Sequence, residues 1–229
     1  MKAFNFLEVV VMLLIERIVV GPLMSNVYLV FDNITEEGIL IDAGDDPDKI
    51  IKIIEKNNVE VKRVYLTHGH FDHVLAIREL KDYLECRFYI HQDDLPILER
   101  AAESCKKLLG RECSNPPSPD GYVKDGDEIT IGENKIKVLH TPGHTPGSVS
   151  YLTDDSVFTG DTLFAGAIGR HDFPGGSLDQ LLNSLNKLLS LPDNYSVYPG
   201  HGPSTTIGVE KIYNPFIGLR GLYRESKKR

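Results

Sequence analysis

The sequence feature that most constrains the fold is a histidine-rich stretch at residues 67–73, directly after a short apolar run. The stretch reads Thr-His-Gly-His-Phe-Asp-His, and the run before it is Val64-Tyr65-Leu66. Such a run predicts a buried strand, which places the polar side chains in the loop at its end. Imidazole nitrogen and carboxylate oxygen are ligands that borderline divalent metals prefer. Because three of the chain's eight histidines stand in this one loop, a metal site explains it better than a polar surface loop does.

Three more apolar runs end in loops that are rich in glycine or proline and hold a His or Asp. Glycine lets the backbone approach a ligand closely, and proline holds a loop still. Functional side chains commonly gather at the same ends of successive strands in α/β proteins, so the loops predict one shared site. The three loops are 140–147, 160–161 and 199–202, with His144, Asp161 and His201 as the candidate residues.

Apolar periodicity in the rest of the chain predicts strands interleaved with amphipathic helices. In 47–57, for example, four isoleucines recur at helical spacing, which indicates a helix with one face against a sheet. The alternation implies a layered α/β domain with two sheets inside flanking helices. The predicted strands are 13–20, 26–31, 38–42, 61–66, 87–90, 128–131, 135–139, 149–152, 157–159 and 196–198, and the predicted helices are 47–57, 74–84, 93–109, 178–189 and a short one after 210–218.

Charge and hydropathy exclude several partner classes. The formal net charge of −8 argues against a nucleic-acid backbone as the main partner. The apolar run 9–15 is too short to span a bilayer, and no small-residue cleavage site follows it. We therefore expect no nucleic-acid or membrane partner and a cytoplasmic protein, either a monomer or a homodimer. Residues 1–11 are expected to be an N-terminal extension, with Met12 as the natural start.

The cysteines are Cys86, Cys105 and Cys113, an odd number without a Cys-x-x-Cys pair. We expect no disulfide framework, and three reduced thiols suit a reducing compartment. Each is expected to be a small buried or half-buried side chain.

The order and spacing of the four loops resemble the metallo-β-lactamase superfamily from about residue 13 to the end. The resemblance implies a single domain over residues 1–229, with a four-layer αββα sandwich of the α/β (α+β) class and a metal centre at the rim of its two sheets. It further implies two divalent ions, zinc first, with iron or manganese also suited to the ligands. By position, one ion would be held by His68, His70 and His144 and the other by Asp72, His73 and His201, with Asp161 bridging the two.

Within the superfamily, the chain is most similar to the compact branch of glyoxalase II-like hydrolases. The similarity lies in Gly160-Asp161-Thr162-Leu163-Phe164, in 169–176 and in Asn214-Pro215-Phe216. That branch lacks the C-terminal helical domain that supplies much of the glutathione-binding surface in glyoxalase II. We expect the helical insertion 93–109 to cover the site instead. Arg170 and His171 are candidate substrate contacts, although Arg170 suits a brace for Asp172 equally well.

The resemblance implies a dinuclear hydrolase in which a hydroxide held between the metals attacks a carbonyl carbon. Asp72 and Asp161 are then the catalytic carboxylates. A thioester such as S-lactoylglutathione is the expected small-molecule substrate, because its thiolate leaves with little acid assistance. Asp42 ends an early strand and is expected to orient a ligand histidine. His91 and His140 stand at strand ends outside the ligand pattern, with His140 a candidate for a similar supporting contact.

Two other functions fit the same residues. Persulfide dioxygenases of the superfamily resemble the chain too, and would place one iron on His68, His144 and Asp161. Metal content would distinguish the two, because the hydrolase requires about two ions per chain. The third possibility is a non-catalytic, metal-stabilised binding protein, which predicts a closed coordination shell.

Overall fold

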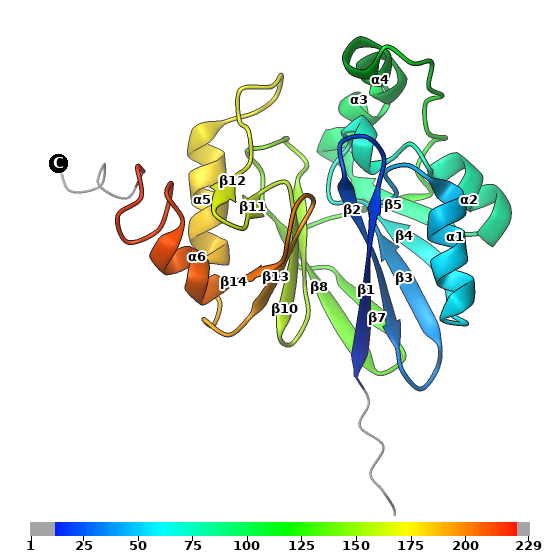
Figure 1. The fold of residues 1–229 in the computed structure, drawn as a ribbon, viewed down its shortest axis with the longest axis horizontal. Helices are drawn as coiled ribbons and strands as arrows, with labels where there is room; N and C mark the ends of the chain where they lie inside the picture. The colour runs from blue at the N-terminus through cyan, green and yellow to red at the C-terminus, as the bar shows by residue number, and fades with distance from the viewer. Residues whose placement is uncertain (1–11, 224–229) are drawn as a thin grey trace, which may run out of the picture.

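The computed structural model describes residues 12–223, and the predicted N-terminal extension, residues 1–11, lies outside them. Within the described part, two six-stranded sheets pack face to face, and helices cover the outer face of each (Figure 1). This confirms the predicted αββα layers. No helix among residues 12–223 is long and apolar enough to cross a membrane.

The first sheet comes from a continuous stretch of chain and has the order β1-β2-β3-β4-β5-β6. Its first three strands are antiparallel, and β3 to β6 are parallel. Helices α1 (Pro47–Lys56) and α2 (Ile77–Leu84) pack on its outer face. The strands are β1 (Leu13–Val20), β2 (Ser25–Asp32), β3 (Glu37–Ile41), β4 (Glu60–Tyr65), β5 (Arg87–His91) and β6 (Gly121–Val123).

The second sheet comes from the rest of the chain and has the order β14-β13-β10-β9-β8-β7. Strands β10 and β13 are parallel, and the other neighbours are antiparallel. Helices α5 (Leu178–Leu188) and α6 (Ile207–Tyr213) cover its outer face. The strands are β7 (Glu128–Ile131), β8 (Asn134–His140), β9 (Val149–Leu152), β10 (Ser156–Gly160), β13 (Ser196–Pro199) and β14 (Thr205–Thr206), and a separate ribbon is formed by β11 (Leu163–Phe164) and β12 (Ala167–Ile168).

Alternating side chains explain why the inner strands are apolar on both faces. In β2, Val27 and Leu29 pack toward α1 and α2, whereas Tyr28 and Val30 pack between the sheets. Successive side chains of a strand point to opposite faces, so a strand covered on both sides reads as a continuous apolar run. The three resulting cores, one between each pair of layers, fix the strand ends in space.

The structure corrects three details of the sequence-based prediction. The predicted helix 93–109 is divided into a 3₁₀ turn, η2 (Gln92–Asp94), and two helices, α3 (Leu95–Leu98) and α4 (Ala101–Leu109). The last helix begins earlier than predicted, because the Thr206 hydroxyl accepts the N–H of Val209 and caps α6. Four short strands were not predicted, because each carries too few residues to show a period. They are β6, β11, β12 and β14.

The expectation of three reduced cysteines is wrong for two of them. Cys105 in α4 and Cys113 in the following segment form a disulfide, and Cys86 is free and buried. The chain reverses after α4 at Gly110, whose φ is +67°, and this brings the Cα atoms of the two bonded residues to 6.3 Å. A spacing of eight residues does not reveal that reversal.

Candidate metal centre

All seven side chains predicted as ligands come together where the strand ends of the two sheets meet. Backbone hydrogen bonds join the sheets there: Val149 of β9 donates to the Thr67 carbonyl at 2.8 Å, and Asn26 of β2 donates to the Gly200 carbonyl at 2.7 Å. The first sheet supplies the loop after β4, including the 3₁₀ turn η1 (Phe71–His73), and the second supplies the other three positions.

The first group consists of His68, His70 and His144, whose nearest ring nitrogens lie within 4.8 Å of one another. His70 Nδ1 lies 3.0 Å from His144 Nε2, and the ring centroids of His68 and His144 are 4.9 Å apart. His68 is fully buried and His144 is 3% exposed, so bulk water does not solvate these nitrogens freely.

The second group consists of Asp72, His73 and His201. His201 Nε2 lies 3.2 Å from Asp72 Oδ2 and 3.3 Å from His73 Nε2. Asp72 Oδ2 also accepts a hydrogen bond from the Ser25 hydroxyl at 3.0 Å, which fixes the carboxylate.

Asp161 lies between the two groups. Its Oδ2 is 3.6 Å from His144 Nε2 and also 3.6 Å from His201 Nε2, while its Oδ1 is 3.5 Å from His73 Nε2. Gly200 makes this approach feasible, because a Cβ at that position would come within 2.2 Å of Asp161 Oδ1. The structure therefore places Asp161 where the prediction of a bridging ligand requires it.

The donor atoms of both groups fit cations rather than each other. His68 Nε2 and Asp161 Oδ1 are buried polar atoms with no hydrogen-bond partner, which is costly unless another group satisfies them. The Nδ1 atoms of His73, His144 and His201 face protein acceptors and therefore carry the ring protons. Their Nε2 atoms therefore face nearby nitrogen and oxygen atoms, and a cation bound in place of a proton there would stabilise the arrangement.

The pKa shifts indicate that the two groups of candidate ligands differ in charge. Burial lowers the pKa of His68 well below its ordinary value, and burial together with the nearby His144 imidazole lowers the pKa of His70 to about 4. Both rings are thus neutral, as metal ligation requires. Burial alone would also lower the pKa of His73, but the surrounding carboxylates raise it to about 10. The group of Asp72, His73 and His201 therefore attracts positive charge.

Protein groups fix the orientation of four of the rings predicted to be ligands. His73 Nδ1 donates to Asp42 Oδ2 at 2.9 Å, the contact expected of Asp42 from the sequence. His144 Nδ1 donates to the Arg170 carbonyl at 2.7 Å, and His201 Nδ1 lies 3.1 Å from the Leu23 carbonyl. The His68 ring nitrogen Nδ1 lies 3.0 Å from the hydroxyl of Thr67. Such contacts set the tautomer and increase ligand basicity.

Asp94 is a residue of the site that sequence analysis missed. Its carboxylate is fully buried and accepts hydrogen bonds from Gly69 N–H at 2.8 Å, Gly147 N–H at 2.6 Å and the Thr145 hydroxyl at 2.7 Å. It therefore ties the loop of His68 and His70 to the loop of His144. Burial raises the pKa of Asp94 while these three donors favour its charged form. Its position just past the end of β5, the neighbour of β4, is the signal that could have identified it.

A cavity of about 980 Å³ opens onto the candidate centre and is lined by both groups, α3, α4 and the 164–175 segment. The insertion 93–109, which was expected to cover the site, thus forms part of the cavity wall. Arg170 lines the cavity, but its guanidinium donates two hydrogen bonds to Asp172 and lies 4.0 Å above the Phe173 ring. His171 is not among the described residues that line it.

Two of the three histidines outside the ligand pattern form a separate pair. His91 and His140 stack with centroids 4.3 Å apart and ring planes 6° from parallel, beside Asp93. Imidazole lone pairs lie in the ring plane, so a single ion cannot lie in both planes. His140 Nε2 also bonds the Pro146 carbonyl at 2.9 Å, and the pair therefore fits a structural role.

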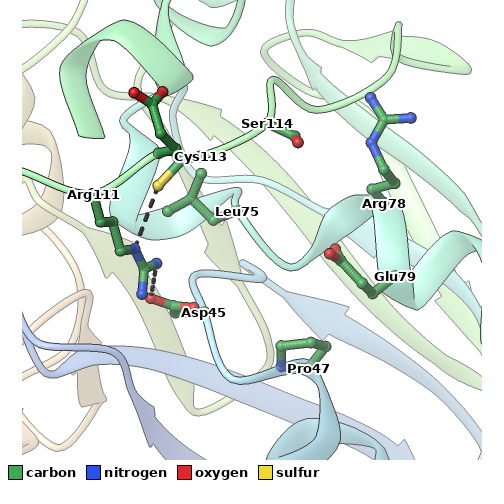
Figure 2. A pocket seen from close by; sticks show the side chains of 9 residues that line it. Asp45, Pro47, Leu75, Arg78, Glu79, Arg111, Cys113 and Ser114 are labelled. Carbon is green, nitrogen blue, oxygen red and sulfur yellow. Dashed lines mark hydrogen bonds and ion pairs between the residues drawn. The ribbon is translucent and has the colours of Figure 1, made fainter. Parts of the chain in front are cut away.

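A smaller hollow of about 360 Å³ lies beside the segment that follows α4 (Figure 2). Arg111 points across it toward Asp45, to which it donates a hydrogen bond, and it also donates to Cys113 Sγ. Arg78 donates to the Asn115 carbonyl. Both arginines that line this hollow therefore donate hydrogen bonds to other protein groups, and none of the seven predicted ligands lines it.

Comparison with known proteins agrees with this geometry. The model of the metallo-beta-lactamase superfamily matches residues 20–201. The chain is 37% identical over 205 residues to "Probable metallo-hydrolase YqgX" of Bacillus subtilis (strain 168), covering 88% of this chain and 96% of that protein. It is 34% identical over 216 residues to "Hydroxyacylglutathione hydrolase GloC" of Haemophilus influenzae, covering 90% and 99%.

Three solved structures share the fold. The structure of "BLEG-1 B3 metallo-beta-lactamase" has a TM-score of 0.83 at 36% identity, covering 89% of this chain and 99% of that one. "TTHA1623 in a di-iron-bound form" has a TM-score of 0.81 at 40% identity, covering 88% and 99%. "ETHE1 from Myxococcus xanthus" has a TM-score of 0.72 at 31% identity, covering 89% and 84%.

Proposed function

The chain belongs to the metallo-beta-lactamase superfamily, and from that premise we propose that it is a dinuclear metal-dependent hydrolase of thioesters. The observation that carries the proposal is the pair of three-residue ligand groups with Asp161 between them. His68, His70 and His144 would hold one divalent cation, and Asp72, His73 and His201 the other. Two cations so held would lower the pKa of coordinated water and polarise a carbonyl group.

The protein's own contribution is to fix charge and geometry. Asp42 and the Arg170 carbonyl keep His73 and His144 in the tautomer that offers Nε2 to the centre. Asp72 stays ionised, because the nearby imidazoles of His73 and His201 lower its pKa although burial opposes them. We assign catalytic roles to Asp161, whose carboxylate lies within 3.6 Å of imidazoles of both ligand groups, and to Asp72, whose carboxylate lies 3.2 Å from His201 Nε2.

The cavity favours a thioester as the substrate. Among the described residues, no histidine or tyrosine outside the ligand set lines it, so neither of these common proton donors is placed there to assist a poor leaving group. A thiolate needs little such help, because an unperturbed thiol has a pKa of about 8.5. The similarity to the hydroxyacylglutathione hydrolase GloC supports S-lactoylglutathione as the first substrate to test.

The test measures metal content and thioester hydrolysis on the same protein, purified without added metal. We expect about two ions per chain and turnover of S-lactoylglutathione, as two-metal hydrolysis requires. In His144→Ala we expect turnover to be lost and one ion to bind more weakly, because the variant lacks a ligand of the first group. Fully loaded protein that leaves S-lactoylglutathione intact would contradict the thioester proposal.

An iron-dependent persulfide dioxygenase is the second candidate. His68, His144 and Asp161 alone supply two imidazoles and one carboxylate, a set suited to Fe(II) in oxygenases. That function leaves Asp72, His73 and His201 without a role, which is why we favour the hydrolase. One iron per chain, with oxygen consumed in the presence of glutathione persulfide, would favour the dioxygenase.

A further inference from the structure

Helix α4 forms one wall of the cavity, and its side chains divide between a face in the core and a face toward the cavity. Ala101 and Cys105 of α4 are buried in the core that also contains Phe71 of η1, so one face of the helix is anchored beside the candidate centre. Residues three and four apart lie on the same side of a helix, and another face of α4 therefore forms the cavity wall. The lining residues from α4 and its N-cap are Arg100, Glu103, Ser104, Lys107 and Leu108.

Three cationic side chains line the cavity, and two of them have partners. The Arg170 guanidinium donates two hydrogen bonds to the Asp172 carboxylate. Arg100 Nε lies 3.8 Å from a carboxylate oxygen of Glu103. Lys107 makes no ion pair or hydrogen bond within residues 12–223. Of the three cationic side chains that line the cavity, Lys107 is therefore the one that is left to pair with a ligand.

We propose that Lys107 binds an anionic group on the thiol portion of the substrate, a carboxylate or a phosphate. The inference rests on the proposed thioester hydrolysis, with the acyl carbonyl at the candidate centre and the thiol portion along α4. The cavity has room for both, since ligand sites commonly enclose about 300–1,000 Å³. An ammonium group acts as a compact point charge and suits either anion.

The expected effect is modest and depends on salt. Lys107 is exposed, and an exposed ion pair changes affinity by about two- to fivefold. The chain's net charge of −8 repels anions at long range, so the neutral variant loses the local attraction without any compensation. Salt screens such exposed charges, so the effect is expected to shrink at 0.5 M NaCl.

The kinetic experiment compares thioesters that share one acyl group. The thiol is glutathione, with two carboxylates, coenzyme A, with phosphates, or neutral N-acetylcysteamine. The variants are Lys107→Gln and Lys107→Glu. The matched control is Lys106→Gln, because Lys106 is the neighbouring lysine of α4, pairs with Glu112 and does not line the cavity.

We expect Lys107→Gln to raise KM about two- to fivefold for an anionic thioester with kcat unchanged, and Lys107→Glu to raise it further. The neutral thioester and the Lys106→Gln control are expected to behave like wild type. Whether the glutathione or the coenzyme A thioester responds identifies the anion as carboxylate or phosphate. Equal KM changes for neutral and anionic thioesters, or no change for either anionic one, would overturn the role of Lys107.

A binding measurement separates this inference from the proposed function. Calorimetric titration with S-hexylglutathione, a thioether that cannot be hydrolysed as a thioester, is compared with titration of its dimethyl ester. Affinity that requires both Lys107 and free carboxylates supports the inference even if no thioester is hydrolysed, in which case only the proposed function fails. If no thioester is hydrolysed and the wild type binds neither S-hexylglutathione nor desulfo-coenzyme A, which carries the phosphates without the thiol, both the proposed function and the inference are refuted.

Discussion

Replacing Asp94 by Asn tests whether one buried carboxylate holds two ligand loops together. The carboxylate accepts three hydrogen bonds, two at Oδ2 and one at Oδ1, and offers no proton in return. The amide of Asn has nearly the same shape but presents an NH₂ group in place of one oxygen. In either orientation of the amide, a donor therefore faces a donor.

The cost follows from the contacts that are lost. A hydrogen bond to a charged acceptor contributes about 1.5–3 kcal/mol, and a buried donor left unsatisfied costs about 1–3 kcal/mol. Repacking cannot easily relieve this, since Asp94 is fully buried and a Cβ at Gly147 would already lie 2.7 Å from its backbone nitrogen. We therefore expect the free energy of unfolding to fall by about 3–5 kcal/mol, which lowers Tm by roughly 6–20 °C in a chain of this size.

The assay pairs thermal unfolding with metal affinity from chelator competition. Because Asp94 joins the loop of His68 and His70 to that of His144, the variant should also bind metal about 10- to 100-fold more weakly. Asp93→Asn is the matched control, since the Asp93 side chain is 59% exposed and belongs to the same turn. Wild-type Tm and wild-type metal affinity in Asp94→Asn would show that the three contacts do not position the loops.

Two further predictions follow from other contacts. Asp42→Ala should weaken metal binding about 10- to 100-fold, because His73 loses the acceptor that fixes its ring; competition with a chelator measures it, and unchanged affinity would refute it. Although partial burial alone would raise the pKa of Asp120, hydrogen bonds from Lys81 and from the Phe88 N–H lower it. Its stabilisation is thus present above the ordinary Asp pKa of about 3.9 and is lost as pH falls through the lower folded value. Asp120→Asn should destabilise the protein by about 1 kcal/mol at pH 7 and less at pH 3 in urea unfolding, whereas a difference independent of pH would contradict this.

Local sequence patterns predicted those parts of the fold that local physics determines. The isoleucines of α1 recur with a helical period, and the unbroken apolar run before Thr67 is typical of a strand buried on both faces. The ligand residues could be proposed because each stands at the end of such a run. The ligand assignment itself stays a prediction until metal is measured, although the structure brings all seven side chains together.

Contacts between distant residues are what the sequence could not reveal. Asp94 acts through Thr145 and Gly147, which are 51 and 53 positions away, and no local pattern marks that relation. For Arg170 the sequence left two partners equally favoured, and the structure pairs it with Asp172. The division of 93–109 depends on Arg100, whose backbone leaves helical geometry between α3 and α4.

Each sheet is built from one uninterrupted half of the chain, and the candidate centre takes ligands from both. The half before residue 124 carries His68, His70, Asp72 and His73, and the half after it carries His144, Asp161 and His201. Neither half alone would hold a complete set for either ion. Under the proposed assignment, the binding of each ion would therefore be linked to the docking of the two halves, because each ion would join side chains from both.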